Sequence, residues 1–174
     1  MKYFQLFTSL NGRIGRADFW KGSIGIFVGY LLLGGLAIAL GFSTEQNFTQ
    51  TIAVEGQETQ QIVGTQWQVN PWATFLITLV MMVPFMFLAV KRRHDRNFSG
   101  VDIYGFVALQ LLIGLLTAVG FNGAPLVALS VVSVVWSICL LILLGFLRGT
   151  VGSNDFGPDP LIVQTRSSPK QAGA

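Results

Sequence analysis

Four long stretches without Asp, Glu, Lys, Arg or His constrain the fold of this chain more than any other feature. They cover residues 22–42, 72–90, 103–121 and 126–147. At about 1.5 Å per helical residue, each spans about 28–33 Å, which matches a hydrocarbon core of about 30 Å. Charged residues make up 11% of the chain and hydrophobic residues 52%, too little charge to cover a soluble domain of this size. The sequence therefore predicts an all-α membrane protein with four transmembrane helices.

The charged residues are divided unequally between the two sides of this domain. All eleven lysine and arginine residues lie before the first span, between the second and third, or after the fourth. The loop between the first and second spans carries three glutamates and no basic residue. Because basic loops stay in the cytoplasm, we predict that both termini are cytoplasmic. The net charge of +3 is then a consequence of topology, and no nucleic-acid partner is expected.

The other segments complete a single transmembrane domain over residues 1–160. The runs Thr51–Glu55 and Gln60–Val63 flank Gly56, which predicts a small β-hairpin in the long external loop. Residues 161–174 are polar and low in aromatic side chains. We predict that they form a disordered cytoplasmic tail.

The segment Lys91–Gly100 contains the only histidine and four of the eleven basic residues. If the second helix continues past the membrane, Asp95 lies four residues after Lys91 and three after Arg92, and can pair with either. A second basic pair, Arg13 and Arg16, precedes the first span. These arginines can fold back beneath the helices and pair with aspartates of other loops, namely Asp95, Asp102 or Asp155.

The basic residues of these segments have three interpretations. They can serve only to fix topology, they can bind a phosphate or lipid headgroup through the planar fork of arginine, or they can form a docking surface for a partner. Anionic lipid attracts each basic residue near the surface by about 1 kcal/mol. The candidate binding residues are Arg13, Arg16, Lys91, Arg92, Arg93, His94 and Arg96.

Glycines and prolines in the segment Gly152–Pro160 require a specific turn rather than a regular element. Asn154 can satisfy backbone groups within such a turn. We therefore interpret the segment as a structural clasp on the cytoplasmic face, held by the two basic segments. The predicted clasp residues are Asp95, Ser99, Gly100, Asn154, Gly157, Asp159 and Pro160.

The neighbouring pair His94 and Asp95 invites an acid–base interpretation. Adjacent residues on a helix point in different directions, so His94 would have to meet an aspartate from another segment, such as Asp18, Asp155 or Asp159. No nucleophile, second histidine or metal-ligand spacing accompanies it. We expect no catalytic residue, no metal and no cofactor, and hence a protein that is not an enzyme.

Three ordered motifs of this chain are fairly specific in combination. They are Gly12-Arg13-x-x-Arg16-x-x-Phe19-Trp20, Lys91-Arg92-x-His94-Asp95 with Ser99-Gly100, and Gly152-x-Asn154-x-Phe156-Gly157-x-Asp159-Pro160. Together they resemble the signatures of domain-of-unknown-function family 805, the YhaH-like small bacterial inner-membrane proteins. The resemblance implies a multi-pass protein of the bacterial inner membrane. The sequence departs from the family pattern after Ser99-Gly100, where the family usually has one or two tryptophans and this chain has Val101-Asp102.

Three functions fit these features. The first is a structural or interaction protein whose basic motifs bind anionic lipid headgroups or a membrane-protein partner. The second is a small transporter or channel, formed as a homo-oligomer because four spans with no charged pathway seldom enclose one alone. The spans lack the ionisable group usual in ion-coupled transporters, which disfavours a proton-coupled mechanism. The third is an enzyme acting on a phospholipid headgroup. A water-filled cavity lined by Gln110, Ser133 and Ser137 would favour transport. A phosphate-sized pocket at Arg13, Arg92 and His94 would favour lipid binding.

Overall fold

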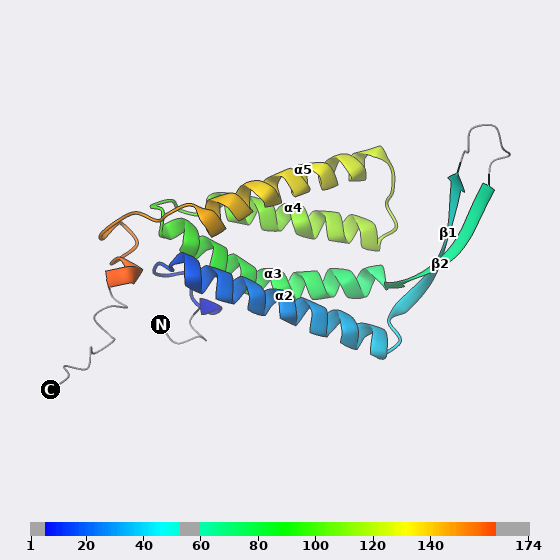
Figure 1. Cartoon of the computed structure of the whole chain (residues 1–174), viewed down its shortest axis with the longest axis horizontal. Helices are drawn as coiled ribbons and strands as arrows, with labels where there is room; N and C mark the ends of the chain where they lie inside the picture. Colours follow the sequence, from blue (N-terminus) through cyan, green and yellow to red (C-terminus); the bar gives the residue numbers. More distant parts are fainter. Residues whose placement is uncertain (1–5, 53–59, 163–174) are drawn as a thin grey trace.

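The computed structural model describes residues 6–52 and 60–162, which form four long helices and a β-hairpin (Figure 1). All four predicted spans and the hairpin are confirmed. All four helices begin before the predicted spans, the first by six residues, and the second also continues to His94, because a helix does not have to end where the lipid does. In chain order the elements are α2 (Arg16–Ala39), β1 (Ser43–Ile52), β2 (Gln60–Val69), α3 (Pro71–His94), α4 (Val101–Ala118), α5 (Ala124–Leu141) and the π-helical turn η1 (Ile142–Phe146).

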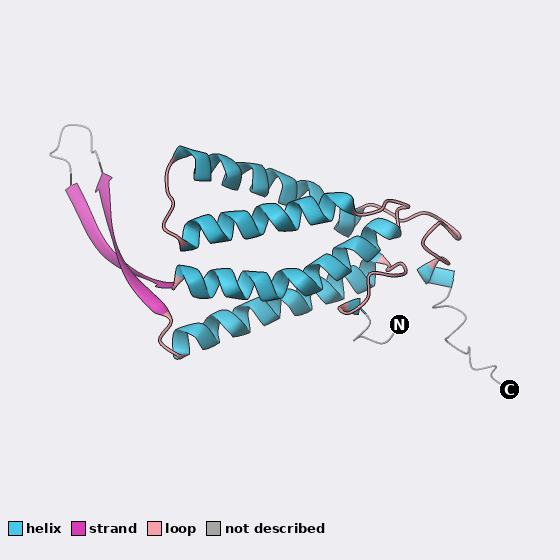
Figure 2. Ribbon diagram, turned by 180° about the vertical axis from the view of Figure 1, so that it is seen from behind, coloured by secondary structure: helices cyan, strands magenta, loops and turns pink. Residues whose placement is uncertain are grey.

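Helix α3 lies at the centre of the arrangement, with α2 on one side and α4 on the other (Figures 1 and 2). Helix α5 packs on α4, and η1 returns to contact α2 and α3. The buried core lies at the end of the bundle where α3 finishes and η1 begins. It is formed by Leu6, Ile14, Phe19, Leu88, Ala89, Val90, Ile103, Phe106, Leu140 and Leu144.

The hairpin projects from the opposite end of α2 and α3 (Figure 1). Its strands are antiparallel, with register from Ser43 opposite Val69 to Ile52 opposite Gln60, so it is longer than predicted. The predicted turn around Gly56 lies outside the described residues. At the base, Asn70 caps α3: its side chain accepts a hydrogen bond from the backbone N of Trp72 at 2.9 Å, as expected of an N-cap residue.

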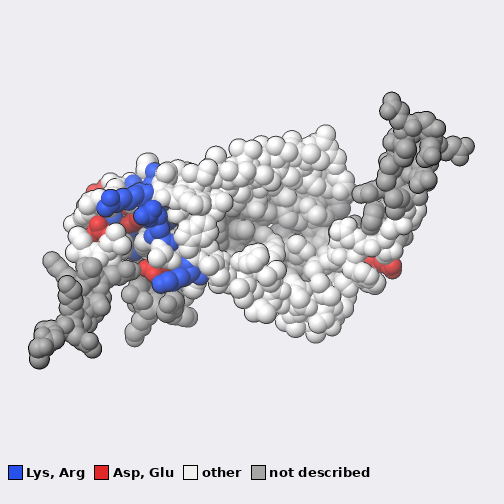
Figure 3. Space-filling view, in the orientation of Figure 1, with Lys and Arg blue, Asp and Glu red and all other residues white. Residues whose placement is uncertain are grey.

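The lateral surface of the bundle is apolar. Each of α2, α3, α4 and the continuous α5–η1 unit is long and apolar enough to cross a membrane, and large side chains such as Phe27, Leu32 and Val127 are exposed along them. Figure 3 shows a wide band without charge, with lysine and arginine gathered at one end. We call this end the basic end and the other the hairpin end. The chain is a multi-pass membrane protein.

The predicted disordered tail lies almost entirely outside the described residues. Its first two residues, Leu161 and Ile162, belong to a helical turn that begins at Pro160. Residues 163–174 are not described, so the disordered tail stays a prediction.

Candidate functional site

Asp95, the residue that follows α3, is the centre of a buried ion cluster at the basic end. Its Oδ1 atom accepts hydrogen bonds from Nε and Nη2 of Arg13, at 3.2 and 3.0 Å. Its Oδ2 atom accepts one from Nη1 of Arg92. The side chains of both arginines are 1% exposed and that of Asp95 is 6% exposed. We call these three residues the arginine–aspartate cluster; it contains two of the pairings that the sequence offered.

The remaining donors of the two arginines bind backbone carbonyl groups. Arg92 donates to Leu144 O at 2.8 Å and to Leu147 O at 2.6 Å, which satisfies carbonyls at the end of η1 that lack helical partners. Arg13 donates to carbonyls further along, those of Thr150 and Gly152, both at 2.7 Å. These two arginines therefore hold the end of the last helix and the segment after it. Their guanidinium groups face the protein, not a ligand.

The segment 147–159, which we call the C-terminal loop, folds back beneath the end of α3. Asn154 Nδ2 donates to His94 O at 2.8 Å and to Thr150 Oγ1 at 2.9 Å. Asn154 and Gly157 form an antiparallel bridge, and Gly157 has φ of 130°, a conformation that favours glycine. The loop thus brings Asn154, Gly157 and Asp159 of the predicted clasp close to Asp95.

Two other residues of the predicted clasp lie elsewhere. Ser99 is exposed, and Gly100, with φ of 76°, forms the turn from α3 into α4. A Cβ at Gly100 would lie 3.3 Å from the side chain of Val90, so close packing and backbone conformation both favour glycine there. These two residues shape the α3–α4 turn rather than hold the C-terminal loop.

His94 is stacked on Phe156, with ring centroids 3.9 Å apart and planes 6° from parallel. Its Nδ1 atom lies 3.3 Å from the carbonyl oxygen of Gly12. Within residues 6–52 and 60–162, no hydrogen bond joins His94 to Asp18, Asp155 or Asp159, the aspartates that the sequence offered as partners. This histidine joins three segments of the chain.

The other candidate basic residues do not form one patch. Lys91 is fully buried at the end of α3. Arg93 pairs with Asp102 at 3.0 Å and lies over the ring of Phe98, 4.8 Å from its centroid. Arg96 lies 5.9 Å from the same centroid. Arg93 and Arg96 therefore flank an exposed phenylalanine on the α3–α4 turn.

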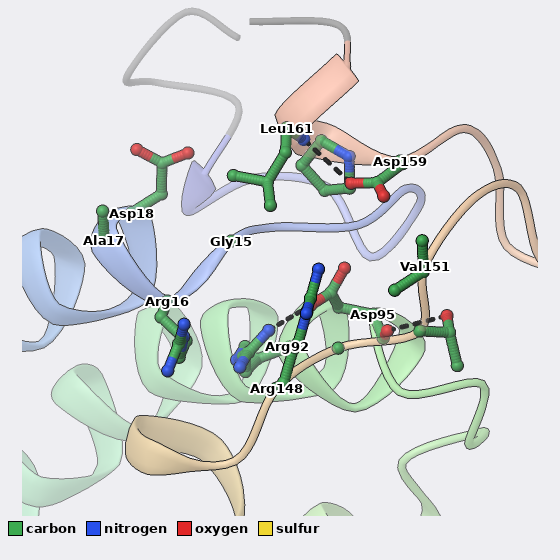
Figure 4. Close-up of a pocket in the computed structure, with 13 residues that line it drawn as sticks. Gly15, Arg16, Ala17, Asp18, Arg92, Asp95, Arg148, Val151, Asp159 and Leu161 are labelled. Carbon is green, nitrogen blue, oxygen red and sulfur yellow. Dashed lines mark hydrogen bonds and ion pairs between the residues drawn. The ribbon is translucent and has the colours of Figure 1, made fainter.

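A cavity of about 270 Å³ opens between the first turn of α2 and the C-terminal loop. Arginines from three segments line it: Arg16, Arg92 and Arg148 (Figure 4). Within the described part of the chain, Arg16 makes one hydrogen bond, to Phe146 O at 3.3 Å. Arg148 is exposed, and among the described residues it has no hydrogen bond or ion pair. We call this hollow the basic cavity.

The backbone of α2 adds positive potential to the basic cavity. The helix begins after Gly15, so the N-cap residue supplies no side-chain acceptor for the amide groups of the first turn. Gly15, Arg16, Ala17 and Asp18 all line the cavity.

The three carboxylates at the basic cavity are already engaged by the protein. Asp95 is bound by two arginines, Asp159 accepts two backbone N–H groups, and Asp18 lies 4.0 Å from the ammonium group of Lys21. In Figure 4 the carboxylate of Asp18 points away from Arg92 and Arg148. The side chains left to meet a ligand are Arg16 and Arg148.

Sequence comparison places this arrangement in a family. The model of the family described as "Protein of unknown function (DUF805)" matches residues 7–158. The chain belongs to the DUF805 family. The match covers the four helices, the arginine–aspartate cluster and the C-terminal loop up to Pro158, and it confirms the resemblance seen in the three motifs. No curated protein and no solved structure gives a significant match.

One residue of the basic cavity in this DUF805 protein was not among the candidates from the sequence. Arg148 follows the last apolar span and was counted only as a topology signal. Its position four residues before the Gly152–Pro160 motif is the one signal in the sequence that connects it with the clasp. Its role could not be inferred without the path of the C-terminal loop.

Asp159 gives the C-terminal loop of this DUF805 protein a dependence on pH. Hydrogen bonds from the backbone of Leu161 and then of Gly152 hold the pKa of its carboxyl below its ordinary value of 3.8, assisted by the charges of Arg13 and Arg148. A carboxyl whose pKa is lower in the folded state than in the unfolded state stabilises the fold at pH values above the unfolded-state pKa. This contribution is lost as the pH falls through the folded-state pKa.

We therefore expect Asp159→Asn to melt at a lower temperature than wild type at neutral pH, with the difference shrinking below about pH 4. Thermal unfolding in detergent between about pH 7 and pH 3 measures this difference. Asp155→Asn is the control, because the side chain of Asp155 caps no backbone group in the described loop. A difference that stays constant with pH would show that the carboxylate does not hold the loop.

Proposed function

We propose that this protein is a non-enzymatic protein of the bacterial inner membrane that binds the headgroup of an anionic phospholipid in the basic cavity. The observation that carries the proposal is the convergence of Arg16, Arg148 and the first turn of α2, whose N-cap is a glycine, on one hollow of about 270 Å³. Arginine forks and bare helix N-termini are both suited to phosphate. The buried Arg13 and Arg92 have a structural role in this proposal, because they hold the last helix and the C-terminal loop that border the basic cavity.

The distribution of charge supports an orientation with the basic end in the cytoplasm. Every described lysine and arginine lies at that end, and Glu45 is exposed near the start of β1 at the hairpin end (Figure 3). The positive-inside rule then gives cytoplasmic termini. In that orientation the basic cavity lies at the level of the headgroups of the inner leaflet, which is where anionic lipid would meet it.

The first test compares lipid retention by the purified full-length protein in mild detergent, measured by native mass spectrometry. Equal amounts of phosphatidylglycerol and phosphatidylcholine are offered to wild type, Arg16→Ala and Arg148→Ala. Because hydrogen bonds to charged groups contribute about 1.5–3 kcal/mol, we expect each variant to retain about tenfold less phosphatidylglycerol. Arg96→Ala is the matched control, since Arg96 is a cation at the basic end that does not line the cavity.

The outcomes separate the sources of phosphate. Loss of phosphatidylglycerol in both arginine variants, with the control unchanged, supports a headgroup site. If inorganic phosphate displaces the lipid at equal concentration, the site recognises the phosphate group alone. If the arginine variants retain as much lipid as wild type, the arginines serve topology and the proposal fails.

A second candidate function is passage of a small polar solute. A hollow of about 520 Å³ near the hairpin end is lined in part by Tyr30, Thr78 and Gln110. Ser133 and Ser137 do not line it: the hydroxyl of Ser133 is hydrogen-bonded to Gln110, and that of Ser137 to a backbone carbonyl. The hollow thus differs from the one that the sequence offered. Solute flux into vesicles that depends on Gln110, with lipid retention indifferent to the arginines, would favour this function.

A further inference from the structure

A second hollow lies directly beside the basic cavity, on the membrane-facing side of the same helix. It has a volume of about 370 Å³ and is lined mostly by apolar side chains of α2 and α5, with a floor formed by Phe85 of α3 and Phe106 of α4. We call it the lateral groove. Its polar members are few, and two of them, Tyr30 and Ser137, are hydrogen-bonded within the protein. Such a groove accepts hydrocarbon and excludes water.

The lateral groove and the basic cavity are consecutive along α2. Residues 15–18 line the basic cavity, and the lining of the groove begins at Phe19 and Trp20. The contact between α2 and η1 lies at this junction, where Trp20 Nε1 donates to Gly145 O at 3.2 Å. Arg92 links the two hollows from the other side, because it lines the basic cavity while it binds the carbonyl of Leu144, whose side chain lines the groove.

The length of the groove matches one leaflet. From Phe19 to Tyr30, α2 rises about 16 Å, and half of a hydrocarbon core of about 30 Å is about 15 Å. A helix of a partner protein would fill the groove equally well by shape, but it would not account for the cationic cavity at its end. The charge at one end and the apolar lining of the rest fit the two parts of one amphiphile.

We propose that the lateral groove holds one acyl chain of an anionic phospholipid whose phosphate group occupies the basic cavity. This inference rests on the proposed function and names its ligand as an intact lipid. An acyl chain gains little hydrophobic free energy by moving from lipid into a protein groove, where packing is the main gain. The groove therefore sets the orientation of the bound lipid and favours a lipid with an acyl chain, while the arginines supply most of the affinity.

The test uses Trp20 as a reporter, because its indole ring lines the groove. In the full chain, Trp67, Trp72 and Trp136 are replaced by phenylalanine, and folding is checked by circular dichroism. The protein is placed in vesicles that contain phosphatidylglycerol or phosphatidylcholine with brominated acyl chains. We expect brominated phosphatidylglycerol to quench Trp20 at least about twofold more than brominated phosphatidylcholine at equal mole fraction, because the charged cavity enriches the anionic lipid at this site.

Two matched substitutions on α2 locate the chain. Ser23→Phe adds a ring inside the groove and is expected to remove the extra quenching. Val28→Phe adds the same ring at a position that does not line the groove, and is expected to leave the quenching unchanged. Native mass spectrometry of both variants, in the background with all four tryptophans, is expected to show phosphatidylglycerol still bound, because the arginines are intact.

The two proposals fail in different ways. Equal quenching by the two lipids, with arginine-dependent retention preserved, would overturn the acyl-chain site and leave the headgroup site standing. Retention independent of Arg16 and Arg148 would overturn both. Shielding of Trp20 from both lipids, together with a dimer in the mass spectrum, would identify a second copy of the chain as the occupant and would overturn the inference.

Discussion

Asp95→Ala is expected to lower the free energy of unfolding by about 3–5 kcal/mol, because it leaves two buried guanidinium groups without a counter-ion. Both Arg13 and Arg92 have side chains that are 1% exposed, so water cannot replace the lost carboxylate. The measurement is unfolding of the purified protein in mixed micelles with increasing denaturing detergent. Loss of secondary structure at Asp95→Ala should begin at a clearly lower denaturant fraction.

The control for this prediction is Asp102→Ala. Asp102 also pairs with an arginine at 3.0 Å, but its side chain is 29% exposed, and ion pairs exposed to solvent contribute about 0–1 kcal/mol. If Asp95→Ala costs no more than Asp102→Ala, the burial of the cluster does not stabilise the protein. A double-variant cycle of Arg13→Ala with Asp95→Ala would then show no coupling energy between the two residues.

Gly149→Ala is expected to be nearly as destabilising, by about 3 kcal/mol or more, because it moves the same carboxylate. A Cβ at this position would overlap Oδ2 of Asp95 and would lie 2.5 Å from Cγ and 2.8 Å from the carbonyl oxygen of the same residue. The carbonyl belongs to the backbone, so the clash cannot be relieved by rotating a side chain. Either Asp95 or the C-terminal loop must shift, and both arginine pairs weaken.

Gly25→Ala is the matched control for Gly149→Ala. Beyond the backbone of its own helix and its two chain neighbours, no atom lies within 4 Å of a Cβ at Gly25. Alanine raises helix propensity by up to about 1 kcal/mol, so this variant should be neutral or slightly stabilised. The same detergent titration compares the two. If Gly149→Ala unfolds together with wild type, the C-terminal loop is free to retreat from Asp95, and its role as a clasp is refuted.

The helical architecture could be predicted because its cause is local. An uncharged run of about 20 residues has one stable solution in lipid, the helix, and its position is read directly from hydropathy. The pairing of Arg92 with Asp95 was equally accessible, since residues three apart share a helix face. Arg13 could be assigned to a set of aspartates, but the sequence could not choose Asp95 from that set.

The basic cavity could not be predicted because it depends on the path of the C-terminal loop. Arg92 donates to Leu144 and Leu147, where the last helix ends in a π-helical turn, and nothing in the apolar run 126–147 indicates such a turn. The stacking of His94 on Phe156 joins residues far apart in the chain. Without knowledge of these contacts, the sequence does not distinguish basic residues that bind the protein's own backbone from basic residues that bind a ligand.

The contacts of the C-terminal loop also mean that the basic end can close only after the last span has been made. Arg13 is made early, yet its partners at Thr150 and Gly152 lie 137 and 139 residues later, and Arg92 waits for carbonyls of the last span. Until the fourth helix has inserted, Arg13 and Arg92 lack these carbonyl acceptors. A chain that ended before residue 147 would lack these carbonyl acceptors: Arg13 and Arg92 would keep Asp95 as their partner but lose their hydrogen bonds to Leu147, Thr150 and Gly152.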